Sequence, residues 1–128
     1  MKSWLDKINW NKDNLVPVIV QETGTKQILM HAWMSRDSLE KTYKSGKATY
    51  WSRSRQSLWV KGESSGHYQF VESIQTDCDY DALLITVKQG GGIACHTGRY
   101  HCFFTKLIDN NWIKTEKILK DPRDIYGK

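Results

Sequence analysis

The chain has 128 residues, a hydrophobic fraction of 39% and a charged fraction of 26%, which exclude collagen-like and disordered proteins and indicate one globular domain. Its net charge of +5 suits anionic partners, although such a value is also ordinary for a small protein. No apolar run approaches the roughly 20 residues of a membrane span, and the charged N-terminus lacks a signal-peptide core. We therefore expect a cytoplasmic protein with one domain over residues 1–128 and no membrane partner.

The first half of the chain predicts a β-hairpin. Residues 1–14 are polar around a few apolar side chains and suggest a short amphipathic lead-in. Val16–Val20 is typical of a buried strand, and Gln27–Met34 of a second strand. Because Gly24 and Thr25 supply a turn between them, the two strands are expected to pair as a hairpin.

A helix is expected next. Ser35 is a suitable N-cap, because its hydroxyl can accept a hydrogen bond from the first turn of a helix. Leu39 and Tyr43 stand four residues apart and predict one apolar face, and Ser45 with Gly46 ends the helix.

The rest of the chain is rich in predicted strands separated by glycine turns. A last amphipathic stretch, Trp112–Leu119, precedes a polar tail. The expected fold is mainly β with one or two short helices, an α+β domain built as a compact sheet or pseudo-barrel. The four further strands are expected at Ala48–Trp51, Ser57–Lys61, Tyr68–Gln75 and Ala82–Lys88.

An acidic cluster could bind a cation. Asp77, Asp79 and Asp81 alternate along the chain, which places three carboxylates on one side of an extended segment and Cys78 on the other. Their mutual repulsion is costly unless a cation or solvent compensates it. Carboxylate oxygens suit Mg²⁺, and the spacing does not fit an EF-hand calcium loop. A solvated acidic turn is the alternative explanation.

Three cysteines, Cys78, Cys95 and Cys102, fall within one short segment. A reducing compartment disfavours a disulfide. If Gly98 and Arg99 form the tip of a tight turn, Cys95 and Cys102 face the same way and supply half of a tetrahedral Zn²⁺ site. Cys78 could be a third ligand, provided by this chain's fold or by a symmetry-related subunit. Buried, inert thiols are the alternative for each of them.

His96 lies beside Cys95, and its role is left open by the spacing. It could be a fourth metal ligand, a general acid or base, or an ordinary hydrogen-bonded histidine.

The segment Trp51–Gly62 combines basic and aromatic residues. Arg53 and Arg55 alternate with serines and form a dense array of donors for phosphate. The flanking tryptophans could stack on a base, which is also what a nucleic-acid-binding strand would show. A charged, solvated strand face is the third possibility.

Three of these segments together resemble one known family. The stretches WSRSRQSLWVKGESSGH, DCDYDALLITV and GGGIACHTGRYHCFF, within a similarity from about Val18 to Phe104, resemble phosphoribosyl-AMP cyclohydrolase of histidine biosynthesis. The resemblance implies a homodimer with a zinc site across the subunit interface and magnesium at the aspartates. It makes Asp77, Asp79 and Asp81 ligands of Mg²⁺. It makes Cys95 and Cys102 zinc ligands from one subunit and Cys78 the zinc ligand from the other.

The family's reaction is the hydrolytic opening of the adenine ring of 1-(5-phosphoribosyl)-AMP between N1 and C6. The resemblance therefore implies a zinc-activated water as nucleophile and a phosphorylated nucleotide as partner. His96 is our candidate for the general acid or base. The two phosphates of the substrate are expected to be bound by basic side chains, for which the candidates are Arg53, Arg55, Lys61 and Arg99.

The alternative hypothesis is a non-catalytic zinc module that binds nucleic acid through the segment rich in tryptophan and arginine. Basic charge and aromatic residues support it, but it leaves the aspartates and the three glycines before Cys95 unexplained. The enzyme hypothesis is therefore preferred, with no nucleic acid as partner. A deaminase of free nucleosides lacks the H-x-E and P-C-x-x-C elements.

Overall fold

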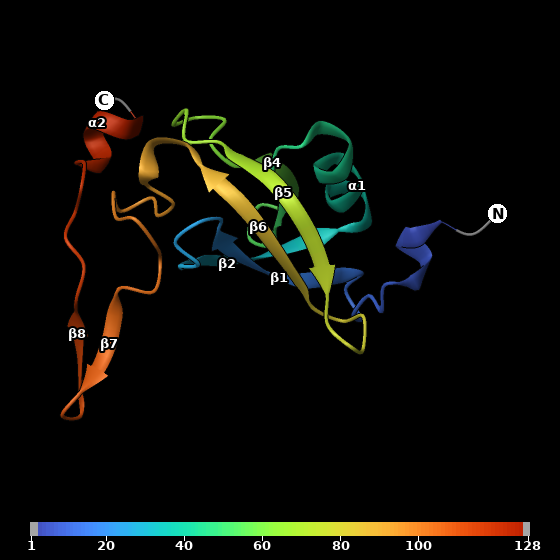
Figure 1. Cartoon of the computed structure of the whole chain (residues 1–128), viewed down its shortest axis with the longest axis horizontal. Helices are drawn as coiled ribbons and strands as arrows, with labels where there is room; N and C mark the ends of the chain where they lie inside the picture. The colour runs from blue at the N-terminus through green and yellow to red at the C-terminus, as the bar shows by residue number, and fades with distance from the viewer. Residues whose placement is uncertain (1–2, 127–128) are drawn as a thin grey trace.

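The structure, a computed structural model, describes residues 3–126; the outermost residues of the expected lead-in and polar tail, 1–2 and 127–128, lie outside the described residues. The described part is mainly β with short helices, as predicted (Figure 1). Its strands form one four-stranded sheet and two separate pairs, so no sheet here closes into a barrel. No helix within residues 3–126 has the length and apolar character needed to cross a membrane. The elements are η1 (Trp4–Lys7), β1 (Leu15–Glu22), β2 (Ile28–Ser35), α1 (Arg36–Ser45), β3 (Thr49–Ser52), β4 (Ser57–Val60), β5 (Gln69–Thr76), β6 (Leu83–Gln89), η2 (Gly90–Gly92), β7 (Thr105–Ile108), β8 (Asn111–Lys114) and α2 (Pro122–Tyr126).

The main sheet has the strand order β2-β1-β6-β5. β1 and β2 form the predicted antiparallel hairpin, and β5 and β6 form a second antiparallel pair. The two pairs are joined by a parallel contact between β1 and β6, in which Val18 lies opposite Leu83. β6 therefore lies inside the sheet, and the segments at its two ends emerge at opposite edges of the molecule (Figure 1).

One face of this sheet forms the core. Alternate residues of β1, such as Val18 and Val20, are fully buried, and their cross-strand neighbours on β6 are buried with them. Because side chains alternate between the two faces of a strand, this pattern follows directly from the valine spacing. Leu39 of α1 and Tyr50 of β3 belong to the same cluster, so the helix and the β3–β4 pair cover this face.

Helix α1 begins and ends where the sequence predicted. The Ser35 hydroxyl accepts a hydrogen bond from the Ser38 N–H, and Gly46 ends the helix in the left-handed conformation with φ of 77°. The predicted apolar face is only half right. Leu39 is buried, but Tyr43 is 64% exposed and lies against the Trp4 ring. Thr42 is buried in its place, because its hydroxyl donates to the carbonyl oxygens of Ser38 and Thr49.

The C-terminal part differs most from expectation. β7 and β8 pair as a hairpin that projects from the main sheet, and every residue of both strands is exposed (Figure 1). The expected amphipathic stretch Trp112–Leu119 begins in β8 and is exposed throughout, so it has no buried face. The short helix α2 lies in what was expected to be a polar tail.

Tyr50 anchors a buried polar network. Its hydroxyl donates to the side-chain oxygen of Gln69, whose amide in turn donates to Gln89. Both Tyr50 and Gln69 are fully buried, so neither group has water as a substitute partner. The network thus connects β3, β5 and β6 immediately before the loop that follows β6.

Tyr50→Phe is expected to lower the free energy of unfolding by about 1–3 kcal/mol, because it leaves the buried Gln69 oxygen without its donor. The exposed Tyr43→Phe is the matched control and should change stability by less than about 0.5 kcal/mol. Urea unfolding of both variants measures the difference. Equal midpoints would show that the network contributes nothing to stability.

Candidate active site

The predicted metal ligands lie in two groups at opposite ends of β6. Cys78 and the three aspartates occupy the turn before this strand, residues 77–82, and Cys95 and Cys102 follow its other end. A strand of this length spans about 20 Å at roughly 3.3 Å per residue. The turn before β6 and the loop after it lie apart (Figure 1), so a single chain does not bring Cys78 to the other two cysteines.

The second group lies in what we call the cysteine loop, residues 94–102. Cys95 and Arg99 pair through the Cys95 N–H, and the Gly98 N–H donates back to the Cys95 carbonyl. Gly98 has φ of 88°, a conformation that glycine adopts without strain. The predicted tight turn is therefore present. The loop is tied to the main sheet by the Cys102 N–H, which donates to the Leu29 carbonyl of β2 at 2.7 Å.

The side chains of Cys95 and Cys102 meet at this loop. Cys95 is buried, its sulfur accepts a hydrogen bond from the Thr97 hydroxyl, and its thiol lies close enough to Cys102 to raise the pKa of the Cys102 thiol. The pKa of the Cys102 thiol is raised to about 12, chiefly by desolvation of its sulfur and then by Cys95, while Lys61 opposes the rise. The Cys102 residue as a whole is exposed. The desolvation that raises this pKa therefore acts on its sulfur, beside Cys95. Two adjacent sulfurs are suitable donors for a soft or borderline metal such as Zn²⁺.

Lys61 connects the cysteine loop to the segment after β4. Its ammonium donates to the Ala94 carbonyl. Burial lowers the pKa of Lys61, while the neighbouring Cys102 and Cys95 thiols act in the opposite direction. The charge thus lies beside the two sulfurs and not in open solvent.

A cavity of about 360 Å³ opens beside Lys61. Arg55 and His96, two further residues predicted for the site, line the same cavity. Tyr126 of α2 also lines it, and burial raises the pKa of that phenol. The sequence offered no signal for Tyr126, because it lies far from every motif. The structure therefore brings together both cysteines, Lys61, Arg55 and His96.

Two of the predicted phosphate-binding residues lie elsewhere. Arg53, in the turn between β3 and β4, places its guanidinium 4.6 Å from the centre of the Trp33 ring. Arg99 is buried, donates through Nε to the Glu116 carbonyl and lies over the Phe104 ring. Neither residue lines the cavity beside Lys61, so their role in substrate binding stays a prediction.

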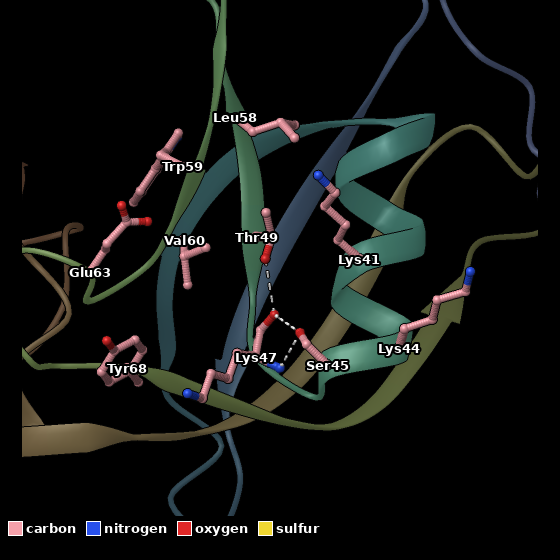
Figure 2. Close-up of a pocket in the computed structure, with 10 residues that line it drawn as sticks. All are labelled: Lys41, Lys44, Ser45, Lys47, Thr49, Leu58, Trp59, Val60, Glu63 and Tyr68. Atoms are coloured by element: carbon pink, nitrogen blue, oxygen red, sulfur yellow. Dashed lines mark hydrogen bonds between the residues drawn. The ribbon is translucent and has the colours of Figure 1, made fainter.

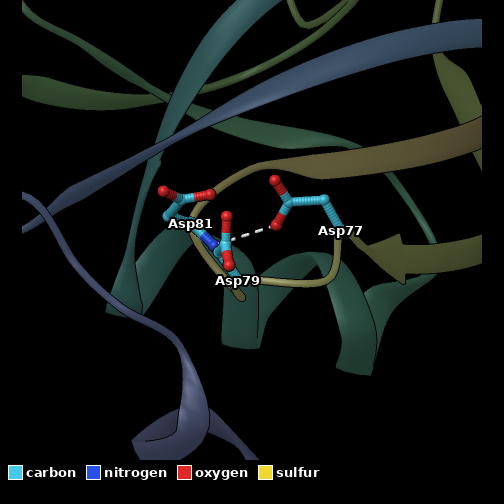
Figure 3. A group of neighbouring side chains, drawn as sticks. All are labelled: Asp77, Asp79 and Asp81. Atoms are coloured by element: carbon cyan, nitrogen blue, oxygen red, sulfur yellow. Dashed lines mark hydrogen bonds between the residues drawn. The ribbon is translucent and has the colours of Figure 1, made fainter.

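The aspartates do cluster, but in a turn and not in the expected extended segment. Tyr80 has φ of 60°, and the Asp77 carboxylate accepts the Asp81 N–H (Figure 3). One carboxylate oxygen from each of the three aspartates lies within 4.8 Å of the others. Desolvation acts to raise the pKa of Asp77, but the hydrogen bonds that it accepts hold it below its ordinary value. The pKa of Asp81 is raised, first by its hydrogen bond with Asp77.

A larger cavity, of about 610 Å³, lies between α1 and the β3–β4 pair (Figure 2). Its apolar side chains include Leu58 and Val60, and Lys41 and Lys44 of α1 lie at its rim. These lysines already approach Asp37 and Glu40 on the helix. None of the predicted site residues lines this cavity, so it is not the candidate site.

The tryptophans do not form one platform for a nucleic acid. Tyr50 lies opposite Trp59 and Leu58 opposite Trp51, so Trp51 and Trp59 point to opposite faces of the β3–β4 pair. Trp59 packs against the Tyr50 ring, with ring centres 5.1 Å apart. This arrangement gives the nucleic-acid hypothesis no continuous binding face.

Comparison with known proteins shows the family of the chain. The family model described as phosphoribosyl-AMP cyclohydrolase matches residues 30–104, which include Arg55, Lys61 and all three cysteines. The chain is 58% identical to the phosphoribosyl-AMP cyclohydrolase of Methylobacillus flagellatus, over 97% of this chain and 95% of that protein. It is 57% identical to those of Thioalkalivibrio sulfidiphilus, over 97% and 95%, and Methylococcus capsulatus, over 99% of each chain. The non-catalytic alternative is therefore set aside, and the chain belongs to the phosphoribosyl-AMP cyclohydrolase family of enzymes.

Proposed function

We propose that this enzyme opens the adenine ring of 1-(5-phosphoribosyl)-AMP by hydrolysis between N1 and C6, in the cytoplasm, as a step of L-histidine biosynthesis. Membership of the family supports the reaction class. The observation that carries the proposal is the closeness of the Cys95 and Cys102 thiols, beside a cavity lined by Lys61, Arg55 and His96.

Cys95 and Cys102 would hold a zinc ion. Their sulfurs are the soft donors that Zn²⁺ takes in proteins, and they are already adjacent. When bound, zinc supplies a water molecule whose pKa is lowered towards neutrality. Two protein ligands leave the site incomplete, since catalytic zinc sites ordinarily have three.

Cys78 of a second copy would be the third ligand. The length of β6 keeps this residue away from its own chain's cysteine loop, but the turn that carries it is exposed and accessible to another molecule. The proposal therefore implies a homodimer with two equivalent sites, because a symmetric pair repeats every contact twice.

The cavity would bind the substrate. Arg55 and Lys61 offer positive charge to a phosphate, and a guanidinium can bind one with two hydrogen bonds. His96 lies on the cavity wall, where it can take a proton from the attacking water or give one to N1 as the N1–C6 bond breaks. The water oxygen stays on C6. Arg53 and Arg99 are the remaining candidates for the second phosphate.

The clustered oxygens of Asp77, Asp79 and Asp81 would hold Mg²⁺, a hard cation that prefers such ligands. In the proposed dimer this turn would approach the other subunit together with Cys78.

Arg55→Ala and Arg53→Ala are each expected to weaken substrate binding by about 1–3 kcal/mol, the cost of losing a charge-assisted hydrogen bond. Steady-state kinetics should show this as a raised KM for phosphoribosyl-AMP. Arg123→Ala, which removes an exposed arginine paired with Asp121, is the matched control. Wild-type kinetics in either variant would show that the replaced arginine does not bind substrate and is an ordinary solvated surface residue.

The direct test combines metal analysis of the purified protein with an absorbance assay on phosphoribosyl-AMP. Stoichiometric zinc and ring opening that stops on chelation are the expected results. Zinc without turnover would contradict the proposed reaction. Nucleic-acid binding that weakens with salt, in a protein without turnover, would instead support the non-catalytic hypothesis.

A further inference from the structure

The C-terminal segment Thr115–Lys120 lies against the cysteine loop. The N–H groups of Leu119 and Lys120 both donate to the Gly98 carbonyl, at 2.8 and 3.3 Å. At its other end, Thr115 donates to the Phe104 carbonyl through both its N–H and its hydroxyl. The segment is therefore attached on both sides of the stretch that contains Arg99, His101 and Cys102.

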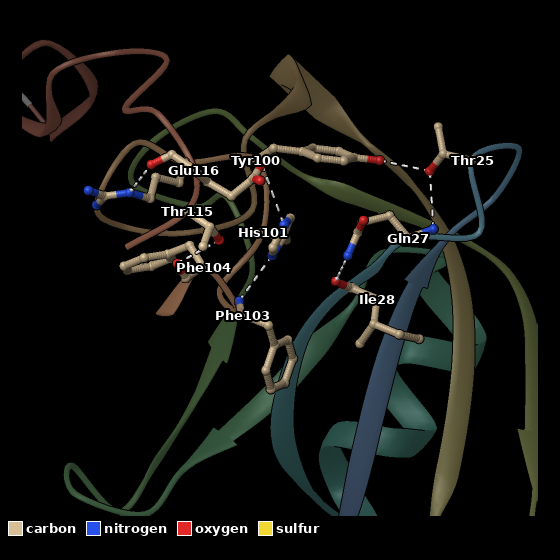
Figure 4. A network of polar contacts seen from close by, with 10 residues as sticks. Thr25, Gln27, Ile28, Tyr100, His101, Phe103, Phe104, Thr115 and Glu116 are labelled. Carbon is tan, nitrogen blue, oxygen red and sulfur yellow. Dashed lines mark hydrogen bonds and ion pairs between the residues drawn. The ribbon is translucent and has the colours of Figure 1, made fainter. Parts of the chain in front are cut away.

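Two buried side chains of the loop complete these attachments, and Figure 4 shows one of them, His101, with Phe103 and Glu116. Arg99 donates through Nε to the Glu116 carbonyl at 2.9 Å, and its guanidinium lies 4.2 Å from the centre of the Phe104 ring. His101 is 7% exposed, and its Nδ1 accepts the Phe103 N–H. The proton of a neutral His101 is then on Nε2, which faces the Glu116 carboxylate at 3.6 Å.

The approach at Gly98 is exceptionally close. A Cβ atom added there would lie 1.9 Å from the Lys120 carbonyl oxygen. Only glycine leaves room for the segment at this point. Glycine is thus required here for the close approach as well as for its positive φ.

We infer that Thr115–Lys120 is a clamp that holds Cys95 and Cys102 in the geometry needed to bind metal, with Arg99, His101 and Glu116 as positioning residues. The inference rests on the proposed zinc site. The cysteine loop is an irregular connection without ladder pairing to a long strand, and ordering such a loop on binding costs conformational entropy. A loop already ordered by the clamp avoids that cost. Residues that hold metal ligands in place without touching the metal typically change metal affinity by about 10–100-fold.

This assignment gives Arg99 a role different from the phosphate binding expected from the sequence. A phosphate ligand would affect the KM for substrate and leave metal binding unchanged. A positioning residue would affect metal binding in the absence of any substrate. The two roles are therefore separable by experiment.

The test measures Co²⁺ binding to the metal-free full-length protein, because thiolate ligation to cobalt gives a charge-transfer absorption band. Arg99→Ala and Gly98→Ala are each expected to raise the dissociation constant about 10–100-fold and to speed metal transfer to a chelator. Arg123→Ala is the control for losing an arginine. Gly24→Ala is the control for backbone strain, since Gly24 has a similar φ of 92° and open space around it. Both controls should bind cobalt within about twofold of the wild type.

Unchanged cobalt affinity in Arg99→Ala, with a raised KM, would overturn the clamp and leave the zinc site intact. A wild-type protein with no thiolate–cobalt band would overturn the proposed zinc site and the clamp with it. Circular dichroism and thermal unfolding of the metal-free variants separate either result from loss of the fold. If Gly98→Ala unfolds, Arg99→Ala alone still decides, because it removes a contact without straining the backbone.

Discussion

Replacing Cys95 or Cys102 by serine is expected to abolish turnover and to reduce the zinc content of the purified protein to a small fraction of the wild-type value. A serine hydroxyl is a hard donor that does not ionise at neutral pH, so it is a poor substitute for thiolate at Zn²⁺. The two thiols lie close together in the structure, and loss of either would leave one of the two proposed ligands in this chain.

The two positions differ in burial, which calls for a control. Cys95 is 4% exposed, so a serine there also buries a hydroxyl, whose hydrogen bonds must then be made within the protein. Cys95→Ala avoids that cost, and a normal circular dichroism spectrum would show that its fold is retained. Full zinc occupancy in any of these variants would remove the residue concerned from the ligand set.

The second prediction with a large effect follows if the proposed zinc site is shared between two subunits. Neither Cys78→Ala nor Cys102→Ala should be active as a homodimer, because each lacks one ligand in both sites. When the two are mixed and exchange subunits, each heterodimer has one site with all three cysteines and one site with a single cysteine. Random reassortment makes about half of the dimers heterodimeric, so roughly a quarter of wild-type activity should return.

Subunit exchange must be demonstrated in the same experiment, for example by differential affinity tags followed by co-purification. If exchange is complete and no activity returns, Cys78 does not complete the partner's site. That result would still leave Cys95 and Cys102 as ligands. The geometry already excludes one simple alternative, since β6 separates Cys78 from its own chain's cysteine loop.

The local elements of the fold could be predicted from the sequence because each has a local physical signal. The valine alternation in Val16–Val20, the Ser35 cap and the Gly46 end all depend on neighbouring residues. The parallel pairing of β1 with β6 has no such signal, since it depends on residues distant in the chain. The β7–β8 hairpin was missed because its residues are exposed on both faces and show no period of burial.

The candidate site likewise has some features with a local signal in the sequence and others that depend on distant residues. The closeness of Cys95 and Cys102 follows from the turn at Gly98, which the sequence indicates. The burial of Arg99 under Glu116 and Phe104 requires a contact with the C-terminal segment, which no motif predicted. The aspartates cluster as expected, but by a turn at Tyr80 that strand periodicity could not reveal.

The parallel contact between β1 and β6 also has a kinetic consequence. The hairpins β1–β2, β3–β4 and β5–β6 are local and form quickly, whereas joining Val18 to Leu83 closes a loop that contains β2 to β5. We expect this slow closure to limit the rate of folding, since its chain entropy is lost before the long-range contacts form. The hydrogen bond from the Cys102 N–H to Leu29 on β2 is another long-range contact, and it joins the segment after β6 to the first hairpin. We therefore expect the geometry of the proposed metal site to form late in folding, after the β-hairpins.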